Sequence, residues 1–359
     1  MKIVTVVGAR PQFIKAAAVS RVLRQEMQEV LVHTGQHYDY NMSDIFFNEL
    51  DIPKPDYNLG ISGGSHGEMT GAMLSAIEKV LLQEKPDALL LYGDTNSTLA
   101  GALAAVKLHI PVCHVEAGAR LGTLSNPEEV NRICTDHVST LLLYCTQSAE
   151  EHLKKEGLFE KSALVGDPMY DAFVYYGDRL TVEDRNHIVD FEGNAVALPA
   201  EFYYLTCHRQ ENTDADETLL EIFKAMNSLD APTIYPVHPR NHDRARRLCD
   251  ANHFCNIVLT QPVGYLTSIA LVKDAKKVVT DSGGLQREAF FAGTQCIFIF
   301  PYVAWPETMV DGRNQLATPN AQDILSKLAV EQTVDPSYLP FGDGHAAVKI
   351  RAALRSMLL

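Results

Sequence analysis

The stretch ALLLYGDTNSTLAGALAAVKL, residues 88–108, decides the fold class of this chain. Its first five residues, 88–92, are apolar, which is typical of a strand buried on both faces of a sheet. A polar turn follows, and residues 98–108 then have the spacing of an amphipathic helix. A buried strand that leads into a helix is the repeating unit of parallel α/β folds.

The same alternation continues on both sides of this stretch. In the first half we expect strands at 3–7, 30–33, 88–92, 112–115, 141–145 and 163–165, and helices at 14–25, 66–82, 98–108 and 127–138. A second series begins after Gly166-Asp167-Pro168, with strands at 202–206, 233–236, 257–259, 277–280 and 295–299 and helices at 217–229, 265–273, 284–292 and 321–329.

This pattern predicts an α/β protein with two Rossmann-like, doubly wound parallel sheets. The 359 residues suffice for two domains. We expect an N-terminal domain at 1–167, a C-terminal nucleotide-binding domain at 168–345 and a last helix at 346–359. Ligands of parallel sheets bind beyond the carboxyl ends of the strands, so the two domains are expected to face each other across one cleft.

Composition excludes several classes of function. The chain has 31 Lys and Arg against 45 Asp and Glu, a net charge of −14, which argues against binding to nucleic acid or to an anionic membrane. No apolar run approaches the ~20 residues that span a bilayer. The seven cysteines include no CxxC pair, which argues against a disulfide framework or a zinc site and favours the cytoplasm.

The segment after the first strand carries two cations. Gly8 permits a tight turn, Arg10 offers a two-pronged donor to an anion, and Lys15 adds a point charge. A capped loop with solvated cations is the alternative interpretation. The segment is not GxGxxG, and no Walker loop occurs, so the sequence predicts no nicotinamide and no other cofactor.

Carboxylates end two neighbouring strands of the first half. Asp94 follows the strand at 88–92, and Glu116 follows the strand at 112–115. Glu128 and Glu129 open the next helix, where acidic residues commonly complement the helix dipole. We therefore expect Glu129 to be structural and favour a chemical role for Asp94 and Glu116.

The second half repeats this arrangement with other residue types. His208-Arg209 and His238 follow two strands, although a histidine before proline is also common as a packed turn residue. Ser282-Gly283-Gly284 at a strand-to-helix junction leaves backbone N–H groups bare for a diphosphate, with Glu288 one turn further on. A plain serine cap is the alternative. No paired-histidine metal motif and no GxSxG motif stand out, so we expect no metal site.

Seven motifs occur in a fixed order along residues 1 to about 310. They are Gly8-Ala9-Arg10-Pro11 with Lys15, His33-Thr34-Gly35-Gln36-His37, Gly93-Asp94-Thr95, Glu116-Ala117-Gly118, Pro127-Glu128-Glu129 with Asn131-Arg132, His208-Arg209 with Glu211-Asn212, and Asp281-Ser282-Gly283-Gly284. Together they resemble the non-hydrolysing UDP-N-acetylglucosamine 2-epimerases. The resemblance implies a glycosyltransferase-B fold, a last helix that packs back on the first domain, and a homodimer.

The resemblance also implies a reaction without redox chemistry. The bond from C1 to UDP breaks, the C2 proton leaves to give a 2-acetamidoglucal, and UDP adds back after a proton arrives on the other face. Among the candidate residues, Asp94, Glu116 and Glu128 would be the acid and base groups. His208 and Arg10 would meet the diphosphate or the leaving UDP, and Arg132 would position the carboxylates or a phosphate. The remaining UDP-sugar contacts would be Lys15, Arg209, His238, Ser282, Gly283, Gly284 and Glu288.

Several alternatives stay open at this point. Residues 8–15, 37–43 and 65–71 are most similar to a branch that acts on UDP-2,3-diacetamido-2,3-dideoxyglucuronate. A hydrolysing epimerase, a glycosyltransferase and a nucleotide-sugar sensor are further hypotheses. The chain also departs from the family pattern at two segments, 119–126 and 300–304. An arginine and two carboxylates are missing at 300–304; either Arg120 or Arg313 compensates, or the substrate differs.

Overall fold

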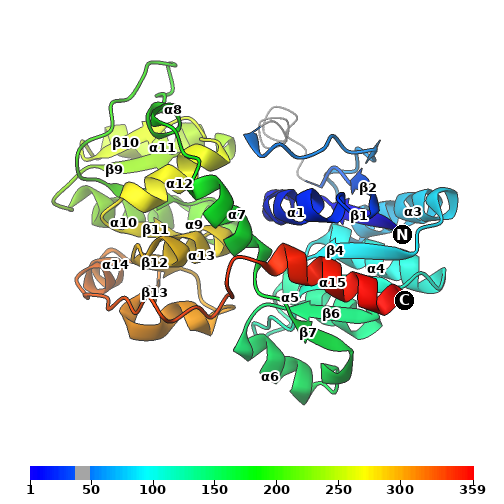
Figure 1. Cartoon of the computed structure of the whole chain (residues 1–359). Coiled ribbons are helices and arrows are strands. Elements are labelled where there is room, and N and C mark those ends of the chain that lie inside the picture. Colours follow the sequence, from blue (N-terminus) through cyan, green and yellow to red (C-terminus); the bar gives the residue numbers. More distant parts are fainter. Residues whose placement is uncertain (37–48) are drawn as a thin grey trace. The chain divides into compact units, whose positions relative to one another are not determined.

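The computed structural model describes residues 1–36 and 49–359 (Figure 1). The motif segment 37–43 therefore lies outside the described residues. The chain divides into two compact units. Unit 1 comprises Met1–Val174 and Tyr338–Leu359, and unit 2 comprises Tyr175–Ser337. The chain passes from unit 1 into unit 2 within α7 (Pro168–Gly177).

Unit 1 is built on a parallel sheet of order β3-β2-β1-β4-β5-β6-β7. This order places β1, β4 and β5 side by side, so that the segments with Arg10, Asp94 and Glu116 follow three neighbouring strands. The one strand that the pattern did not predict, β3, has only two residues. The strands are β1 (Lys2–Val7), β2 (Gln28–His33), β3 (Tyr57–Asn58), β4 (Ala88–Tyr92), β5 (Val112–Ala117), β6 (Leu141–Tyr144) and β7 (Ser162–Leu164).

Helices cover the sheet of unit 1, and the apolar faces of α3 and α4 pack with β1 and β4 in one core cluster. Besides α7, they are α1 (Arg10–Leu23), α3 (His66–Glu84), α4 (Asn96–Lys107), α5 (Pro127–Val138), α6 (Gln147–Lys155) and α15 (Ala346–Leu358), with a 3₁₀ turn, η1 (Phe159–Lys161).

The last helix belongs to unit 1, since α15 packs against α1. Its first turn is capped from a distance, because the carboxylate of Asp171 accepts the backbone N–H groups of Ala346 at 2.9 Å and Ala347 at 2.8 Å. Burial raises the pKa of Asp171, and these two hydrogen bonds oppose the increase. The helix is therefore fixed to unit 1 both by packing and by this distant cap.

The expected start of the first helix is wrong. Helix α1 begins at Arg10, with Pro11 in its first turn, rather than at residue 14. Gln12 explains the earlier start, because its Oε1 accepts the N–H groups of Gly8 at 2.7 Å and Ala9 at 3.1 Å. A glutamine side chain thus supplies the cap that the sequence lacks at Ala9, and Arg10 lies in the first helical turn instead of in a loop.

Unit 2 is built on a second parallel sheet, of order β10-β9-β8-β11-β12-β13. Alternate residues of β8 enter two core clusters, Tyr203 and Leu205 on one face and Tyr204 on the other. The predicted class of two doubly wound parallel sheets is confirmed; β13 was not predicted, because its sequence NQLA has no apolar run. The strands are β8 (Tyr203–Thr206), β9 (Thr233–Pro236), β10 (Ile257–Thr260), β11 (Val278–Thr280), β12 (Cys296–Ile299) and β13 (Asn314–Ala317).

The helices of unit 2 include several short ones that the pattern did not predict. Residues 179–199, which carry no motif, contain α8 and an isolated antiparallel bridge between Val189 and Ala195. The helices are α8 (Val182–Asn186), α9 (Gln210–Thr213), α10 (Asp216–Asn227), η2 (Pro239–Asn241), α11 (His242–Ala251), α12 (Tyr265–Asp274), α13 (Gly283–Ala292), η3 (Pro306–Gly312) and α14 (Ala321–Leu328). Among the described residues, no helix is both long enough and apolar enough to cross a bilayer.

Candidate active site

Gln12 joins the two strand ends that carry the first candidate residues. Its Nε2 donates to the backbone carbonyl of Tyr92 at 2.7 Å and to the hydroxyl of Thr98 at 2.9 Å, while its Oε1 holds Gly8 as described. The side chain is 2% exposed. The turn after β1 and the turn after β4, which leads into Asp94, are therefore held together by one amide group.

Glu116 occupies a β-bulge at the end of β5. The register between β5 and β6 shifts between Val115 and Ala117, which leaves Glu116 as the extra residue. Its φ of +74° is left-handed, a conformation that costs a non-glycine residue free energy and that is concentrated at functional sites. The bulge turns the carboxylate toward α1, where it forms a buried ion pair with the Nζ of Lys15.

Lys15 lies deeper than the sequence suggests. Its side chain is 3% exposed and that of Glu116 is 8% exposed. The Nζ of Lys15 and the Oε1 of Glu116 both lie close to Gly93, at 3.6 and 3.7 Å from where a Cβ would stand. The structure thus brings Lys15 and Glu116 together beside the turn of Asp94. A direct contact from Lys15 to a phosphate stays a prediction.

Arg132 connects two carboxylates at the start of α5. One NH group of its guanidinium forms an ion pair with Asp94, and the other donates to Glu129 at 2.7 Å. Burial alone would lower the pKa of Arg132, but the charge and hydrogen bond of Asp94, with those of Glu129, raise it above its ordinary value. Arg132 therefore stays a cation between the two carboxylates.

Glu129 has a structural role, as its position in the first turn of α5 suggested, but it acts by holding a loop as well as by lying near the helix dipole. Its carboxylate accepts the backbone N–H groups of Leu121 and Gly122, each at 2.9 Å, and is 1% exposed. It thereby anchors the loop that departs from the family pattern. Glu128 is instead exposed on the first turn of α5, and a chemical role for it stays a prediction.

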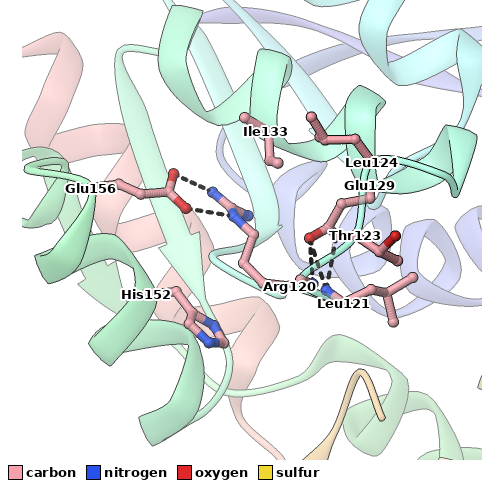
Figure 2. Close-up of a pocket in the computed structure, with 9 residues that line it drawn as sticks. Arg120, Leu121, Thr123, Leu124, Glu129, Ile133, His152 and Glu156 are labelled. Atoms are coloured by element: carbon pink, nitrogen blue, oxygen red, sulfur yellow. Dashed lines mark hydrogen bonds and ion pairs between the residues drawn. The ribbon is translucent and has the colours of Figure 1, made fainter. Parts of the chain in front are cut away.

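A pocket of about 480 Å³ opens beside this anchored loop (Figure 2). Figure 2 shows Arg120 facing Glu156, while Leu121 and Leu124 lie on the other side. The guanidinium of Arg120 donates two hydrogen bonds to the Glu156 carboxylate, each at 2.8 Å. Arg120 also pairs with Asp136 at 2.8 Å, so its guanidinium is committed within unit 1. The pocket is lined by Arg120, Leu121, Gly122, Thr123, Leu124, Glu129, Ile133, His152 and Glu156.

In unit 2, a buried carboxylate organises the segment after β8. Asp281 is 0% exposed and accepts the backbone N–H groups of His208 at 2.9 Å and Arg209 at 2.8 Å, and the amide of Asn212 at 3.2 Å. The ring Nδ1 of His208 lies 3.1 Å from the other carboxylate oxygen. Burial, and next the charge of Asp281, raises the pKa of the neighbouring Cys207 thiol. Because Asp281 contacts both the backbone N–H and the ring Nδ1 of His208, it fixes the orientation of this imidazole.

Cation–π contacts hold the segment 300–304, which departs from the family pattern, and the Trp305 that follows it. The guanidinium of Arg209 lies 4.1 Å from the ring centre of Phe300, and that of Arg287 lies 4.5 Å from the ring centre of Trp305. Arg313 lies over the ring of Phe290 instead, at 4.0 Å, and donates to the Phe290 carbonyl. Arg120 and Arg313, the expected substitutes for the missing arginine, are thus both held by contacts within their own units.

Both interpretations of the Ser282 segment fit its geometry. Ser282 caps α13, because its Oγ accepts the N–H of Leu285 at 3.3 Å. Gly283 nevertheless has open space where a Cβ would stand, so a ligand can approach its backbone at the positive end of the helix. Glu288 is 4% exposed one turn inside. His238 is exposed, and its Nδ1 accepts the N–H of Arg240 at 3.3 Å, as a turn residue would.

Sequence reasoning missed the buried groups that hold these residues. Asp281 follows β11 directly, just as Asp94 follows the turn after β4, and that position was a usable signal. His114 and Asp136 had no such signal, because the two are 22 residues apart in the chain. Gln12 had none either, because it reaches Tyr92 and Thr98, which are 80 and 86 residues away. Among residues 1–36 and 49–359, no group of three His, Cys, Asp or Glu side chains is placed to bind a metal ion.

The chain is similar to proteins of one family along its whole length. A sequence profile described as UDP-N-acetylglucosamine 2-epimerase matches residues 21–355. A Methanococcus maripaludis UDP-N-acetylglucosamine 2-epimerase homolog is 45% identical over 99% of this chain and 100% of its own. The UDP-2,3-diacetamido-2,3-dideoxy-D-glucuronate 2-epimerase of Pseudomonas aeruginosa is 43% identical over the same shares.

A solved structure extends the similarity to the fold. The Methanocaldococcus jannaschii UDP-GlcNAc 2-epimerase, crystallised with UDP-GlcNAc and UDP, superposes with a TM-score of 0.87 at 37% identity, over 99% of this chain and 100% of that one. The expected glycosyltransferase-B type of fold is thereby confirmed. The profile match and these relatives place the chain in the UDP-N-acetylglucosamine 2-epimerase family, a family of isomerases.

Proposed function

We propose that the chain interconverts UDP-N-acetylglucosamine and UDP-N-acetylmannosamine without hydrolysis, for the synthesis of a surface polysaccharide. The observation that carries the proposal is the pair of strand-end carboxylates, each beside a buried cation: Asp94 with Arg132 and Glu116 with Lys15. Asp94 and Glu116 are the candidate acid and base groups of the proposal, and Glu128, exposed on α5, is the third.

The C2 hydrogen has no neighbouring carbonyl and is therefore weakly acidic, so a base can remove it only once the bond from C1 to UDP has broken. In the first step the C1–O bond breaks and its electron pair leaves with UDP. A carboxylate then takes the C2 proton, and the C2–H electrons form the C1–C2 double bond of 2-acetamidoglucal. In the reverse direction a carboxylic acid delivers a proton to the opposite face of C2, and the UDP oxygen bonds to C1. Atoms and charge balance without an oxidant.

Unit 2 supplies the groups that would hold UDP through both steps. The backbone N–H groups of Gly283 and Gly284, in the first turn of α13, suit a diphosphate, whereas the N–H of Ser282 donates to the Thr280 hydroxyl at 3.0 Å. His208, directed by Asp281, suits the leaving oxygen. Arg10, Arg209, His238 and Glu288 are the further substrate contacts of the proposal. A cytoplasmic location and a homodimer belong to it as well; all seven cysteines are described and are free thiols, which fits a reducing compartment.

A second candidate substrate is UDP-2,3-diacetamido-2,3-dideoxyglucuronate. It is favoured by the 43% identity to the Pseudomonas aeruginosa enzyme and by the family departures at 119–126 and 300–304. Both candidates share the reaction at C2, so the choice between them concerns the pocket for the sugar and not the chemistry.

Incubation with single UDP-sugars in deuterated water tests the proposal. We expect mass spectrometry to find one deuterium at C2 in both epimers of the true substrate. Asp94→Asn, Glu116→Gln and Glu128→Gln should each slow this exchange, and Glu160→Gln, on the exposed turn η1, serves as the matched control. If neither candidate UDP-sugar exchanges its C2 hydrogen, the proposal is overturned. Steady release of free sugar would indicate a hydrolysing epimerase.

A further inference from the structure

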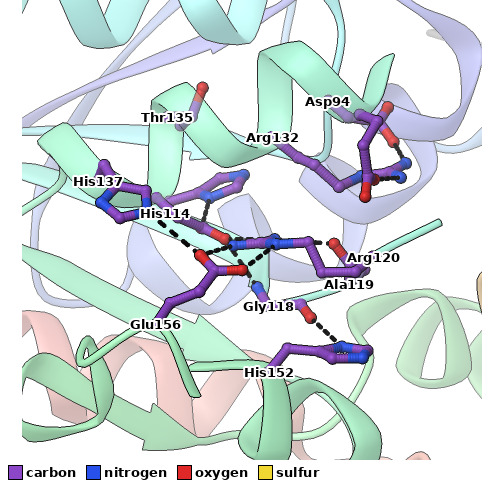
Figure 3. A network of polar contacts seen from close by, with 12 residues as sticks. Asp94, His114, Gly118, Ala119, Arg120, Arg132, Thr135, His137, His152 and Glu156 are labelled. Carbon is purple, nitrogen blue, oxygen red and sulfur yellow. Dashed lines mark hydrogen bonds and ion pairs between the residues drawn. The ribbon is translucent and has the colours of Figure 1, made fainter. Parts of the chain in front are cut away.

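A buried histidine, His114, and a buried aspartate, Asp136, form a pair in unit 1; Figure 3 labels His114 within a network of polar contacts that includes Arg120 and Glu156. His114 on β5 and Asp136 on α5 are both 0% exposed. The ring Nδ1 of His114 lies 2.7 Å from Oδ1 of Asp136, and its Nε2 lies 2.6 Å from the backbone carbonyl oxygen of Gly93. The imidazole therefore bridges α5 and the turn after β4.

Gly93 is the residue directly before Asp94, so this bridge acts on the backbone that carries a candidate carboxylate. Its φ of +63° is left-handed. Its N–H donates to the carbonyl of Val115 at 3.0 Å, and its carbonyl accepts from His114. Both ends of Gly93 are thus bound to β5, which leaves the turn of Asp94 no freedom to rotate without loss of a buried hydrogen bond.

The other oxygen of Asp136 holds the second candidate carboxylate. It accepts the backbone N–H of Gly118 at 3.0 Å and the guanidinium of Arg120 at 2.8 Å. Gly118 has a φ of +79° and follows the bulge of Glu116 by two residues. A Cβ at Gly118 would lie 2.5 Å from the carbonyl oxygen of Ala149, so the backbone passes too close to α6 for any other residue.

The contacts of the pair fix one hydrogen of the imidazole. A carbonyl oxygen accepts and never donates, so the Nε2 of His114 carries the hydrogen that reaches Gly93. Asp136 accepts from the Gly118 N–H and from the Arg120 guanidinium, and its Oδ1 lies 2.7 Å from the Nδ1 of His114. Further charged groups surround the pair. Arg120 also pairs with Glu156, which lies 3.2 Å from the Nε2 of His137. The Nζ of Lys161 donates to the backbone carbonyl of Asp136.

We propose that His114 and Asp136 are positioning residues of the proposed epimerisation, which hold the Gly93 turn and the Glu116 bulge so that Asp94 and Glu116 approach C2 in a set geometry. The inference rests on the proposed function. Neither residue is placed to touch the sugar, since each is fully buried. Their effect is on the orientation of two other carboxylates, and a misplacement of about 1 Å can slow a reaction about a hundredfold.

Two substitutions separate the two hydrogen bonds of His114. His114→Gln places an amide NH₂ near the position of Nε2 and keeps a donor for Gly93, whereas His114→Asn places one near Nδ1 and keeps a donor for Asp136. We expect both variants to lower kcat for C2 exchange, His114→Asn by about tenfold or more, with KM and UDP affinity within about threefold of wild type. Thr135→Val is the control, because the buried hydroxyl of Thr135 has no partner in the described chain.

A structural readout keeps the inference separate from the activity. Amide hydrogen exchange at Gly93 should be faster in His114→Asn and at Gly118 faster in Asp136→Asn, and ¹⁵N spectra of wild type should show a hydrogen on the Nε2 of His114. Folded variants with unchanged kcat and unchanged amide exchange would overturn the inference. A wild type that shows no C2 exchange with any UDP-sugar would overturn the proposed function instead, while the amide and ring measurements still decide whether the pair holds the two turns.

Discussion

His208 and Asp281 form a pair in which an exposed imidazole is held by a fully buried carboxylate, with 3.1 Å between Nδ1 and Oδ1. The same carboxylate accepts the backbone N–H groups of His208 and Arg209. One acidic group on the turn after β11 thus determines both the path of the chain after β8 and the direction of the ring. In the proposed function, the contact of His208 with UDP is therefore made by Nε2.

Replacement of Asp281 by asparagine should therefore damage folding and UDP binding together. An asparagine NH₂ cannot accept, so at least one buried N–H group loses its partner, at a cost of about 1–3 kcal/mol in the free energy of unfolding. Urea unfolding and calorimetric titration with UDP measure the two effects. Asp230→Asn, at an exposed ion pair with Lys276, should stay within about 0.5 kcal/mol of wild type. Equal stability of both variants would contradict the role given to Asp281.

The ion pair of Lys15 and Glu116 predicts a double-mutant cycle with strong coupling. Lys15→Met leaves a carboxylate that is 8% exposed without its cation, which should cost about 3–5 kcal/mol of unfolding free energy. The double variant Lys15→Met, Glu116→Gln has no uncompensated charge and should recover most of that loss. Guanidinium denaturation of the four proteins gives the coupling energy. Additive effects would show that the two groups do not interact.

Removal of the Asp171 carboxylate should loosen the last helix without unfolding unit 1. Asp171→Ala leaves the N–H groups of Ala346 and Ala347 without their cap, which typically costs about 0.5–2 kcal/mol. We expect faster proteolysis within residues 338–359 and little change in the cleavage of residues 1–174. Asp335→Ala, whose carboxylate bonds only locally to Ser337, is the matched control. Equal cleavage rates would mean that α15 is held by its apolar face alone.

Acid stability should depend on Asp136. Burial alone would raise its pKa, but His114, Arg120 and the Gly118 N–H together lower it below the ordinary value. A lowered folded pKa contributes stability that is present above the unfolded pKa of about 3.9 and is lost as the pH falls through the folded value. Thermal unfolding should show a melting temperature that is much lower for Asp136→Asn than for wild type at pH 7. This difference in melting temperature should become smaller below about pH 4. A difference that is constant with pH would contradict this assignment.

The strands were predictable where the strand is buried on both faces, because such a strand has a continuous apolar sequence. Residues 88–92 are such a run, and β4 has the predicted bounds. Strand β13 was not predicted because it is an edge strand, paired with β12, and its first residues Asn314 and Gln315 are polar. Short helices such as α9 were missed for a related reason, since four residues cannot show a helical period.

The site was predictable in its residue types but not in its contacts. Polar residues after buried strands pointed to Asp94, Glu116 and His208, because the carboxyl ends of parallel strands meet at one edge. The partners of these residues come from distant parts of the chain, such as Lys15 for Glu116, and no local pattern encodes them. The bulge at Glu116 depends on the register with β6, which only the assembled sheet determines.

The order in which the chain visits its two units has a consequence for biosynthesis. Residues 175–337 are inserted between the two segments of unit 1, so a ribosome completes the polypeptide of unit 2 before it makes α15. Domains generally fold as units during translation. In the nascent protein, unit 2 is therefore fully synthesised while α1 and the carboxylate of Asp171 still lack their contacts with α15. Helix α15 leaves the ribosomal exit tunnel only after the whole of unit 2.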